Sequence, residues 1–209
     1  MSVNYPTKIP IFPLSGVIFF PTTNLPLNIF EERYLSMVNE SLKSNSLIGM
    51  VQSVEIGGKI FQIGCLGKID THSKTDDGRI LINLLGLSRF KINNEVKNQK
   101  PYREFNVDYN EFKKDLNPSE YKLNENILKE LILNSKKFFD KQGIAINWGQ
   151  LSKLKKFQQI YTLAMICPIS INEKQKLLEI VELSEIANTL NKIIQISFYE
   201  DLSEKNSIQ

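Results

Sequence analysis

The chain has 209 residues, of which 42% are hydrophobic, and this is enough to bury the core of one large domain or two small ones. Its formal net charge is only +3, and just four of its 26 basic residues are arginines. Because the planar guanidinium fork is the preferred device for phosphate and base recognition, this balance gives little support to a dedicated nucleic-acid binder.

The first residues lack the basic stretch and apolar run of a secretory signal, and no apolar segment approaches the roughly 20 residues that span a bilayer. We therefore expect a cytoplasmic protein with no membrane partner. Cys65 and Cys167 lie in apolar sequence surroundings, which is typical of buried, reduced thiols and not of a disulfide framework.

The first half, to about residue 109, alternates short runs of β-forming residues with Gly, Pro and Asp. Asp76, Asp77 and Gly78 lie between two such runs, and Gly78 can take the positive φ of a tight hairpin turn. Tyr34 and its neighbours at helical spacing predict one helix at 31–42. A mostly antiparallel barrel or sheet with one helix is the simplest arrangement. The expected strands are 8–12, 25–29, 47–54, 63–71, 79–87, 89–92 and 105–109.

The period of the apolar residues changes from two to three and four around residues 110–123, and we place a boundary there. The prediction is a β-rich lobe at 1–112 and an α-helical lobe at 113–209. The expected helices begin near residue 127, with a stop at Gln142 and Gly143, and continue at 148–166, at 172–181 and over a last helix. Its apolar face comprises Leu183, Ile186, Ala187, Leu190, Ile193, Ile194 and Phe198.

The residues that usually carry catalysis are scarce. The glycines form no phosphate-binding loop, so an ATPase is not expected. His72 is the only histidine, and two distant cysteines do not make a zinc cage. His72 lies beside a polar hairpin, where an exposed residue is the better interpretation than a catalytic base. We therefore expect no enzyme, no metal site and no cofactor.

A group of lysines at 153, 155 and 156, beside Phe157, has the composition of a basic, aromatic nucleic-acid patch. The same residues on a helix would form a solvated face opposite an apolar stripe, and we prefer that interpretation.

Three segments at the start of the chain are specific: Ile9–Leu14, Val17–Pro21 and Leu25–Tyr34. Their sequence, with the pattern IPIFPL, VIFFP and LPLNIFEERY, resembles the opening of the Lon protease amino-terminal domain. Further fragments follow in the family order through 48–51, 63–69, 77–79 and 85–92, and the helical half matches less strictly. Thr22 and Thr23 depart from the family, because many members have Gly-Met there.

The resemblance implies an α+β fold, with a PUA-like antiparallel β barrel and one helix followed by an α-helical bundle. It also implies that the chain lacks the ATPase and Ser-Lys peptidase segments of Lon. The expected function is non-catalytic binding of unfolded or tagged polypeptide segments, as a proteolysis adaptor or chaperone-like factor working with a protease or chaperone. The alternative is an RNA-binding PUA-like protein.

For the binding site we select motif aromatics and their neighbours, because exposed apolar patches commonly mark protein recognition. The loop at 17–23 is the first choice, and the alternative is that its phenylalanines lie in the core. Arg33 is expected to meet a carboxylate or backbone carbonyls. The candidate residues are Phe19, Phe20, Pro21, Phe30, Arg33 and Tyr34.

Overall fold

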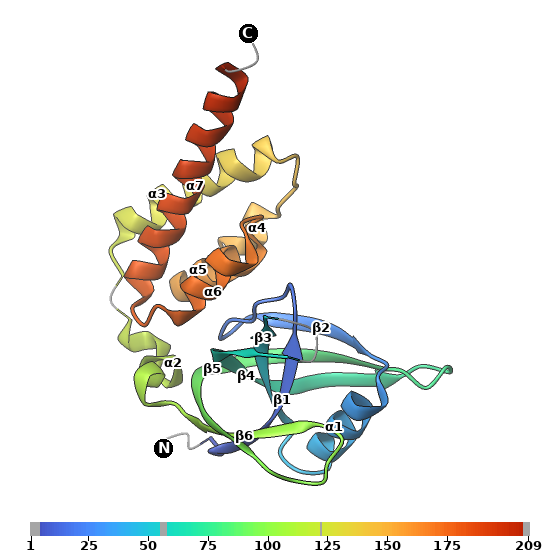
Figure 1. The fold of residues 1–209 in the computed structure, drawn as a ribbon. Helices are drawn as coiled ribbons and strands as arrows, with labels where there is room; N and C mark the ends of the chain where they lie inside the picture. Colours follow the sequence, from blue (N-terminus) through green and yellow to red (C-terminus); the bar gives the residue numbers. More distant parts are fainter. Residues whose placement is uncertain (1–4, 55–57, 122, 207–209) are drawn as a thin grey trace. The chain divides into compact units, whose positions relative to one another are not determined.

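The computed structural model describes residues 5–54, 58–121 and 123–206, and the chain divides into two compact units, Met1–Pro118 and Ser119–Gln209 (Figure 1). This division falls in the stretch 110–123 where the apolar period changes, a few residues after the expected lobe boundary at 112. The short helices η1 (Asn110–Phe112) and α2 (Lys113–Leu116) pack against a strand of the first unit.

The first unit contains a six-stranded sheet and one longer helix, α1 (Glu32–Leu42). The expected runs at 79–87 and 89–92 form one continuous strand, and the hairpin turn at Gly78 is present, with a φ of 86°. The strands are β1 (Lys8–Leu14), β2 (Asn24–Ile29), β3 (Leu47–Ser53), β4 (Ile60–Lys74), β5 (Ile80–Val96) and β6 (Arg103–Asp108).

The long strand β5 closes the sheet into a barrel. The strand order is β2-β5-β4-β3-β1-β6. An additional pairing between β5 and β6 closes the strands β5, β4, β3, β1 and β6 into a ring. β5 pairs with β2 through Ile80–Leu85 and with β6 through Lys91–Val96. β1 and β3 run parallel, so the expectation of an antiparallel barrel is corrected to a mixed one. This parallel pair is possible because α1 returns the chain between β2 and β3.

Alternate side chains from the strands fill the barrel. The apolar cluster includes Ile9 and Ile11 of β1, Val51 of β3, Leu66 of β4 and Phe90 of β5, all nearly inaccessible to solvent. Burial of apolar side chains such as these is the main term that stabilises a folded unit.

The connection from β1 to β2 is clamped onto β5 by close backbone contacts. Thr22 donates its N–H to the Gly86 carbonyl (2.8 Å), and Gly86 donates to the Thr23 carbonyl (2.9 Å). A Cβ at Gly86 would lie 2.2 Å from the carbonyl oxygen of Phe20, so only glycine fits. Thr22 has a φ of 60°, a left-handed conformation that strains a β-branched residue. This strain coincides with the departure from the Gly-Met of the family pattern.

A buried ion pair attaches α2 to the barrel. The carboxylate of Asp115 accepts hydrogen bonds from the Arg89 backbone N–H, from Nε and from Nη2, each at 2.9 Å. Both side chains are fully buried, and the guanidinium lies 4.5 Å from the ring centroid of Phe112. A buried charge pair of this kind needs such complete hydrogen bonding, because desolvation of each ion is costly.

The second unit is helical. The stretch expected as one helix at 148–166 is divided into two, because residues 152–155 form turns. Leu154, which a continuous helix would place in the apolar stripe opposite the lysines, is therefore 37% exposed. The elements are η2 (Pro118–Glu120), α3 (Glu125–Lys141), α4 (Trp148–Leu151), α5 (Lys156–Ile166), α6 (Ile171–Glu179) and α7 (Leu183–Asn206). In the described part of the chain, none of the helices is long and apolar enough to cross a membrane.

Helices α3 and α7 form the main contact of this unit. Leu131 and Phe139 of α3 and Ile186, Leu190 and Ile194 of α7 are buried, in agreement with the apolar face expected for the last helix. A polar cluster also joins the two helices. Asn191 accepts from Asn134 (2.8 Å) and donates to Glu130 (3.0 Å).

Candidate functional site

One end of the barrel opens into a cavity of about 260 Å³, which we call the barrel-mouth cavity. Because β1 and β3 are parallel and β6 runs opposite to β1, the last residues of β1 and β3 and the first residues of β6 meet at the same end. The first turn of α1 completes the wall. Mouths of β barrels are common ligand sites. The lining residues are Ile11, Phe12, Pro13, Leu14, Ser15, Glu31, Arg33, Tyr34, Ser53, Gly58, Pro101, Tyr102 and Arg103.

Two prolines explain why the barrel opens here. Val107 donates its N–H to the Thr7 carbonyl (2.7 Å), so every second residue of β1 counted from Thr7 turns its backbone N–H and C=O groups toward β6. The observed pairing of the two strands ends at Ile11 opposite Arg103. Continuing it would place Pro13 opposite Pro101. Neither proline has an N–H, so this pair cannot form its two hydrogen bonds and the strands separate.

The apolar part of the wall is formed by aromatic and aliphatic side chains. The rings of Phe12 and Tyr34 meet edge-on with centroids 4.3 Å apart. Tyr34 is only 6% exposed, and its pKa is raised above the usual value, primarily because burial disfavours the phenolate. These rings and Leu14 form an apolar part of the cavity lining, while the Ile11 side chain belongs to the barrel core.

Two guanidinium groups also line the cavity. Arg33 pairs with Glu31 (Nη2 to Oε2, 2.7 Å) and lies 4.5 Å from the ring centroid of Tyr34. Arg103 makes a two-pronged pair with Glu95 at 2.8 and 2.7 Å. The hydrogen bonds that Arg103 donates to Glu95 are the main reason why the pKa of Arg103 is raised. Both cations therefore already have carboxylate partners, and the site combines an apolar wall with neutralised charge.

The structure separates the expected site residues into two groups. Arg33 and Tyr34 line the barrel-mouth cavity, and Phe30, directly before α1, is 66% exposed. Phe19, Phe20 and Pro21 are buried. The expected surface location of these last three residues is corrected to the core, because the loop that carries them is held against β5.

Sequence reasoning missed the wall formed by Pro101, Tyr102 and Arg103. The sequence did contain a signal for this wall: Pro13 follows the apolar run of β1, and Pro101 follows the run of β5. It becomes informative only when the two strands are known to be neighbours.

The other reactive side chains show no catalytic arrangement among the described residues. His72 is exposed on β4, and within the described ranges no group of three or more His, Cys, Asp or Glu is placed to hold a metal ion. Burial raises the pKa of the Cys65 thiol well above its usual range and that of Cys167 to about 12. Both thiols are therefore protonated and unreactive at neutral pH.

Comparison with known proteins gives a consistent result. The family model for the ATP-dependent protease La (LON) substrate-binding domain matches residues 8–195. The chain therefore belongs to the Lon substrate-binding domain family.

Two relatives define the extent of the likeness. Lon protease of Malacoplasma penetrans is 30% identical over an alignment of 190 residues that covers 81% of this chain and 23% of that protein. Lon protease of Flavobacterium johnsoniae is 26% identical over 215 residues, covering 98% of this chain and 26% of that protein. The chain thus spans about a quarter of the length of the curated relatives it matches.

Two solved structures share the fold. A Lon N-terminal domain protein from Xanthomonas campestris aligns with a TM-score of 0.65 and 18% identity, covering 88% of this chain and 97% of that one. The N-terminal domain of Mycobacterium avium complex Lon protease aligns with a TM-score of 0.65 and 15% identity, covering 90% and 98%. These likenesses confirm the α+β architecture expected from the motifs.

Proposed function

We propose that the chain binds extended segments of unfolded or tagged polypeptides at the barrel-mouth cavity, and that it acts as an adaptor or chaperone-like factor for a protease. The observation that carries this proposal is the apolar part of the cavity wall, together with the exposed ring of Phe30, which precedes the lining residue Glu31 in the chain. Membership of a substrate-binding domain family supports it.

The size of the cavity favours an extended segment over a folded surface. Its volume is about 260 Å³, whereas an engineered apolar cavity of about 150 Å³ accepts benzene. The site therefore has room for one large side chain at a time. By the alternation along β1, the carbonyl of Pro13 faces this opening and is available to accept a backbone N–H of such a segment.

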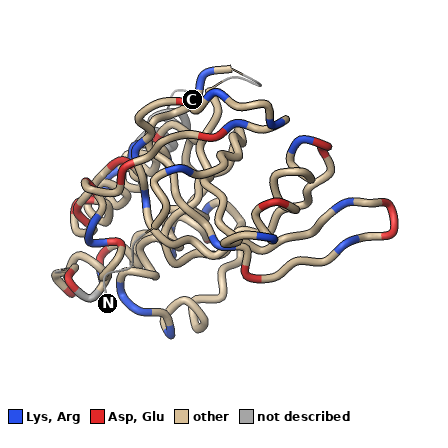
Figure 2. The backbone as a smooth tube through the Cα atoms, turned by 90° about the horizontal axis from the view of Figure 1, so that it is seen from below, with Lys and Arg blue, Asp and Glu red and all other residues tan. Residues whose placement is uncertain are grey.

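The arginines argue against the RNA-binding alternative. Arg33, Arg79, Arg89 and Arg103 each pair with a carboxylate. Figure 2 also shows that lysines and arginines are interspersed with acidic residues along the chain. Phosphate recognition would require these cations to exchange their partners. Buried, protonated Cys65 and Cys167 suit a reducing compartment, so we assign the proposed activity to the cytoplasm.

A titration tests the proposal. A fluorescein-labelled, permanently unfolded polypeptide is titrated with the chain, and binding is followed by fluorescence anisotropy. Combined replacement of Phe30→Ala and Arg33→Ala should weaken binding about tenfold, since truncation of an aromatic or arginine contact commonly costs more than about 1 kcal/mol.

The matched control is Leu133→Ala, which removes another strongly exposed apolar side chain (54%) from the helical unit. It should bind like the unchanged chain. Equal affinity for all three proteins would reject the barrel-mouth site. Binding of a labelled RNA that falls steeply with salt would support the alternative instead.

A further inference from the structure

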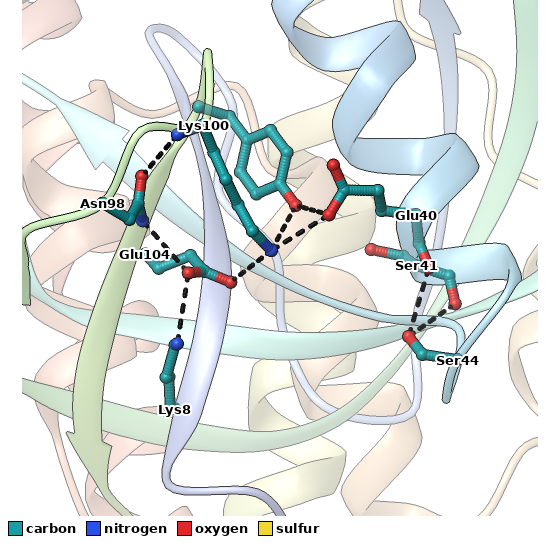
Figure 3. Close-up of polar contacts among 8 residues, drawn as sticks. Lys8, Glu40, Ser41, Ser44, Asn98, Lys100 and Glu104 are labelled. Atoms are coloured by element: carbon teal, nitrogen blue, oxygen red, sulfur yellow. Dashed lines mark hydrogen bonds and ion pairs between the residues drawn. The ribbon is translucent and has the colours of Figure 1, made fainter.

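A cluster of polar side chains ties one wall of the barrel-mouth cavity to α1 (Figure 3). The wall belongs to the turn between β5 and β6, which carries Pro101 and Tyr102. The Tyr102 hydroxyl donates a hydrogen bond to Oε2 of Glu40 on α1 (2.6 Å). Nζ of Lys100 lies 2.9 Å from the same carboxylate oxygen and 2.9 Å from the Tyr102 hydroxyl.

The same cluster is anchored to the barrel. Nζ of Lys100 lies 3.1 Å from Oε1 of Glu104, a nearly buried residue of β6. The other oxygen of Glu104 accepts from Asn98 (3.0 Å) and lies 3.4 Å from Nζ of Lys8 on β1. The turn is thus held from two directions, by α1 and by the strands.

Electrostatics keep the cluster charged at neutral pH. The hydrogen bond from Tyr102, followed by that from Lys100, lowers the pKa of Glu40. The hydrogen bonds with Tyr102 and Glu40 raise the pKa of Lys100. The carboxylate and the ammonium are therefore both ionised under physiological conditions.

The geometry relates this cluster to the width of the cavity. Glu31, Arg33 and Tyr34 at the start of α1 form another part of the cavity lining, and Glu40 lies about two turns further along the helix. Because a helix transmits position rigidly over such a distance, fixing the turn to Glu40 also fixes it relative to the first turn of α1.

We propose that Glu40, Lys100 and Tyr102 are positioning residues that set the width of the barrel-mouth cavity and hence its affinity for unfolded polypeptide. The inference rests on the function proposed above. It assigns a role to two side chains, those of Glu40 and Lys100, that do not line the cavity.

The variants Tyr102→Phe and Glu40→Gln test the inference in the full chain. Tyr102→Phe removes only the hydroxyl and keeps the ring in the wall, while Glu40→Gln removes the charge. Each should weaken binding of the unfolded polypeptide about threefold to tenfold, the range that corresponds to the loss of one typical hydrogen bond. Their melting temperatures should fall by no more than about 2–4 °C, so both variants stay folded in the binding assay.

Two further variants serve as controls. Glu111→Gln breaks an exposed pair with Lys91 (2.7 Å) in the same unit, and neither residue lines the cavity. It should leave affinity unchanged. Lys100→Arg keeps the charge and the donors and should retain most of the affinity.

Hydrogen exchange of residues 98–103 in the free protein provides a readout independent of the client. Exchange should be faster in Tyr102→Phe and Glu40→Gln than in Glu111→Gln. If the unchanged chain binds polypeptide, wild-type behaviour of the two variants in either readout overturns the inference and leaves the proposed function standing. If the unchanged chain binds none, the proposed function fails. The exchange data alone then uphold or refute the positioning role.

Discussion

The β-rich unit and the helical unit are stabilised by different kinds of contact. In the first unit, some positions accept only one kind of residue. Gly86 faces a carbonyl where no Cβ fits, and Arg89 shares a fully buried ion pair with Asp115. In the second, α3 and α7 pack largely through apolar faces that include Leu131 and Leu190. A helix face accepts several apolar residues of similar volume, whereas a close backbone approach or a buried charge accepts few. This difference accounts for strict family motifs in the first half and looser ones in the second.

The largest effect is expected from breaking the buried ion pair. Asp115→Ala leaves the Arg89 guanidinium buried without its carboxylate and should lower the free energy of unfolding by about 3–5 kcal/mol. Urea denaturation followed by circular dichroism measures this change.

The matched control for that variant is Asp77→Ala, which breaks the exposed pair with Arg79 at the hairpin tip. It should leave the urea midpoint unchanged. Similar urea midpoints for the two variants would contradict the view that buried polar contacts make the first unit intolerant of substitution. The double variant Arg89→Met with Asp115→Leu should recover only part of the loss, because the Arg89 backbone N–H also needs the Asp115 carboxylate.

A smaller effect is expected from a conservative change in the helical unit. Leu190→Met keeps the volume of a fully buried side chain on α7 and should cost less than about 1.5 kcal/mol. Trp148, the only tryptophan, packs against Phe139 in this unit and reports its unfolding by fluorescence. A loss as large as that of Asp115→Ala would remove the contrast between the two units.

The smallest effect should be a gain. Thr22→Gly relieves the left-handed backbone strain at this position and removes a buried hydroxyl. We expect a rise of about 1 kcal/mol in the free energy of unfolding, the lower end of the cost of such strain. Thr23→Gly is the control, because Thr23 has no positive φ and its hydroxyl donates to the Phe20 carbonyl (2.7 Å). The Thr23→Gly variant should have a lower free energy of unfolding than the unchanged chain. A rise in both variants would show that relief of backbone strain at Thr22 is not the cause.

Local patterns predicted most of the elements but not how they meet. The helix ending at Leu42, the hairpin at Gly78 and the apolar face of α7 follow from periodicity and turn chemistry within short windows. The parallel β1–β3 pairing depends on contacts between distant segments, and no short window contains it.

The candidate site shows the same limit. Arg33 and Tyr34 were found through a contiguous motif, and both line the barrel-mouth cavity. Phe19 and Phe20 belong to an equally clear motif but are buried, because a motif records constraint without telling core from surface. Tyr102 could not be predicted, since its place in the wall arises from a strand neighbour far away in the sequence.

Site-specific photocrosslinking tests the central claim most directly. p-Benzoylphenylalanine placed at position 30, next in the chain to the cavity-lining residue Glu31, should crosslink a bound unfolded polypeptide on irradiation. The same group at position 133 of the helical unit, where the native leucine is also strongly exposed, should not. Crosslinks at position 30 that disappear on addition of unlabelled polypeptide would support binding at the barrel mouth. Crosslinks at position 133 but not at position 30, with the affinity of the chain unchanged, would contradict it.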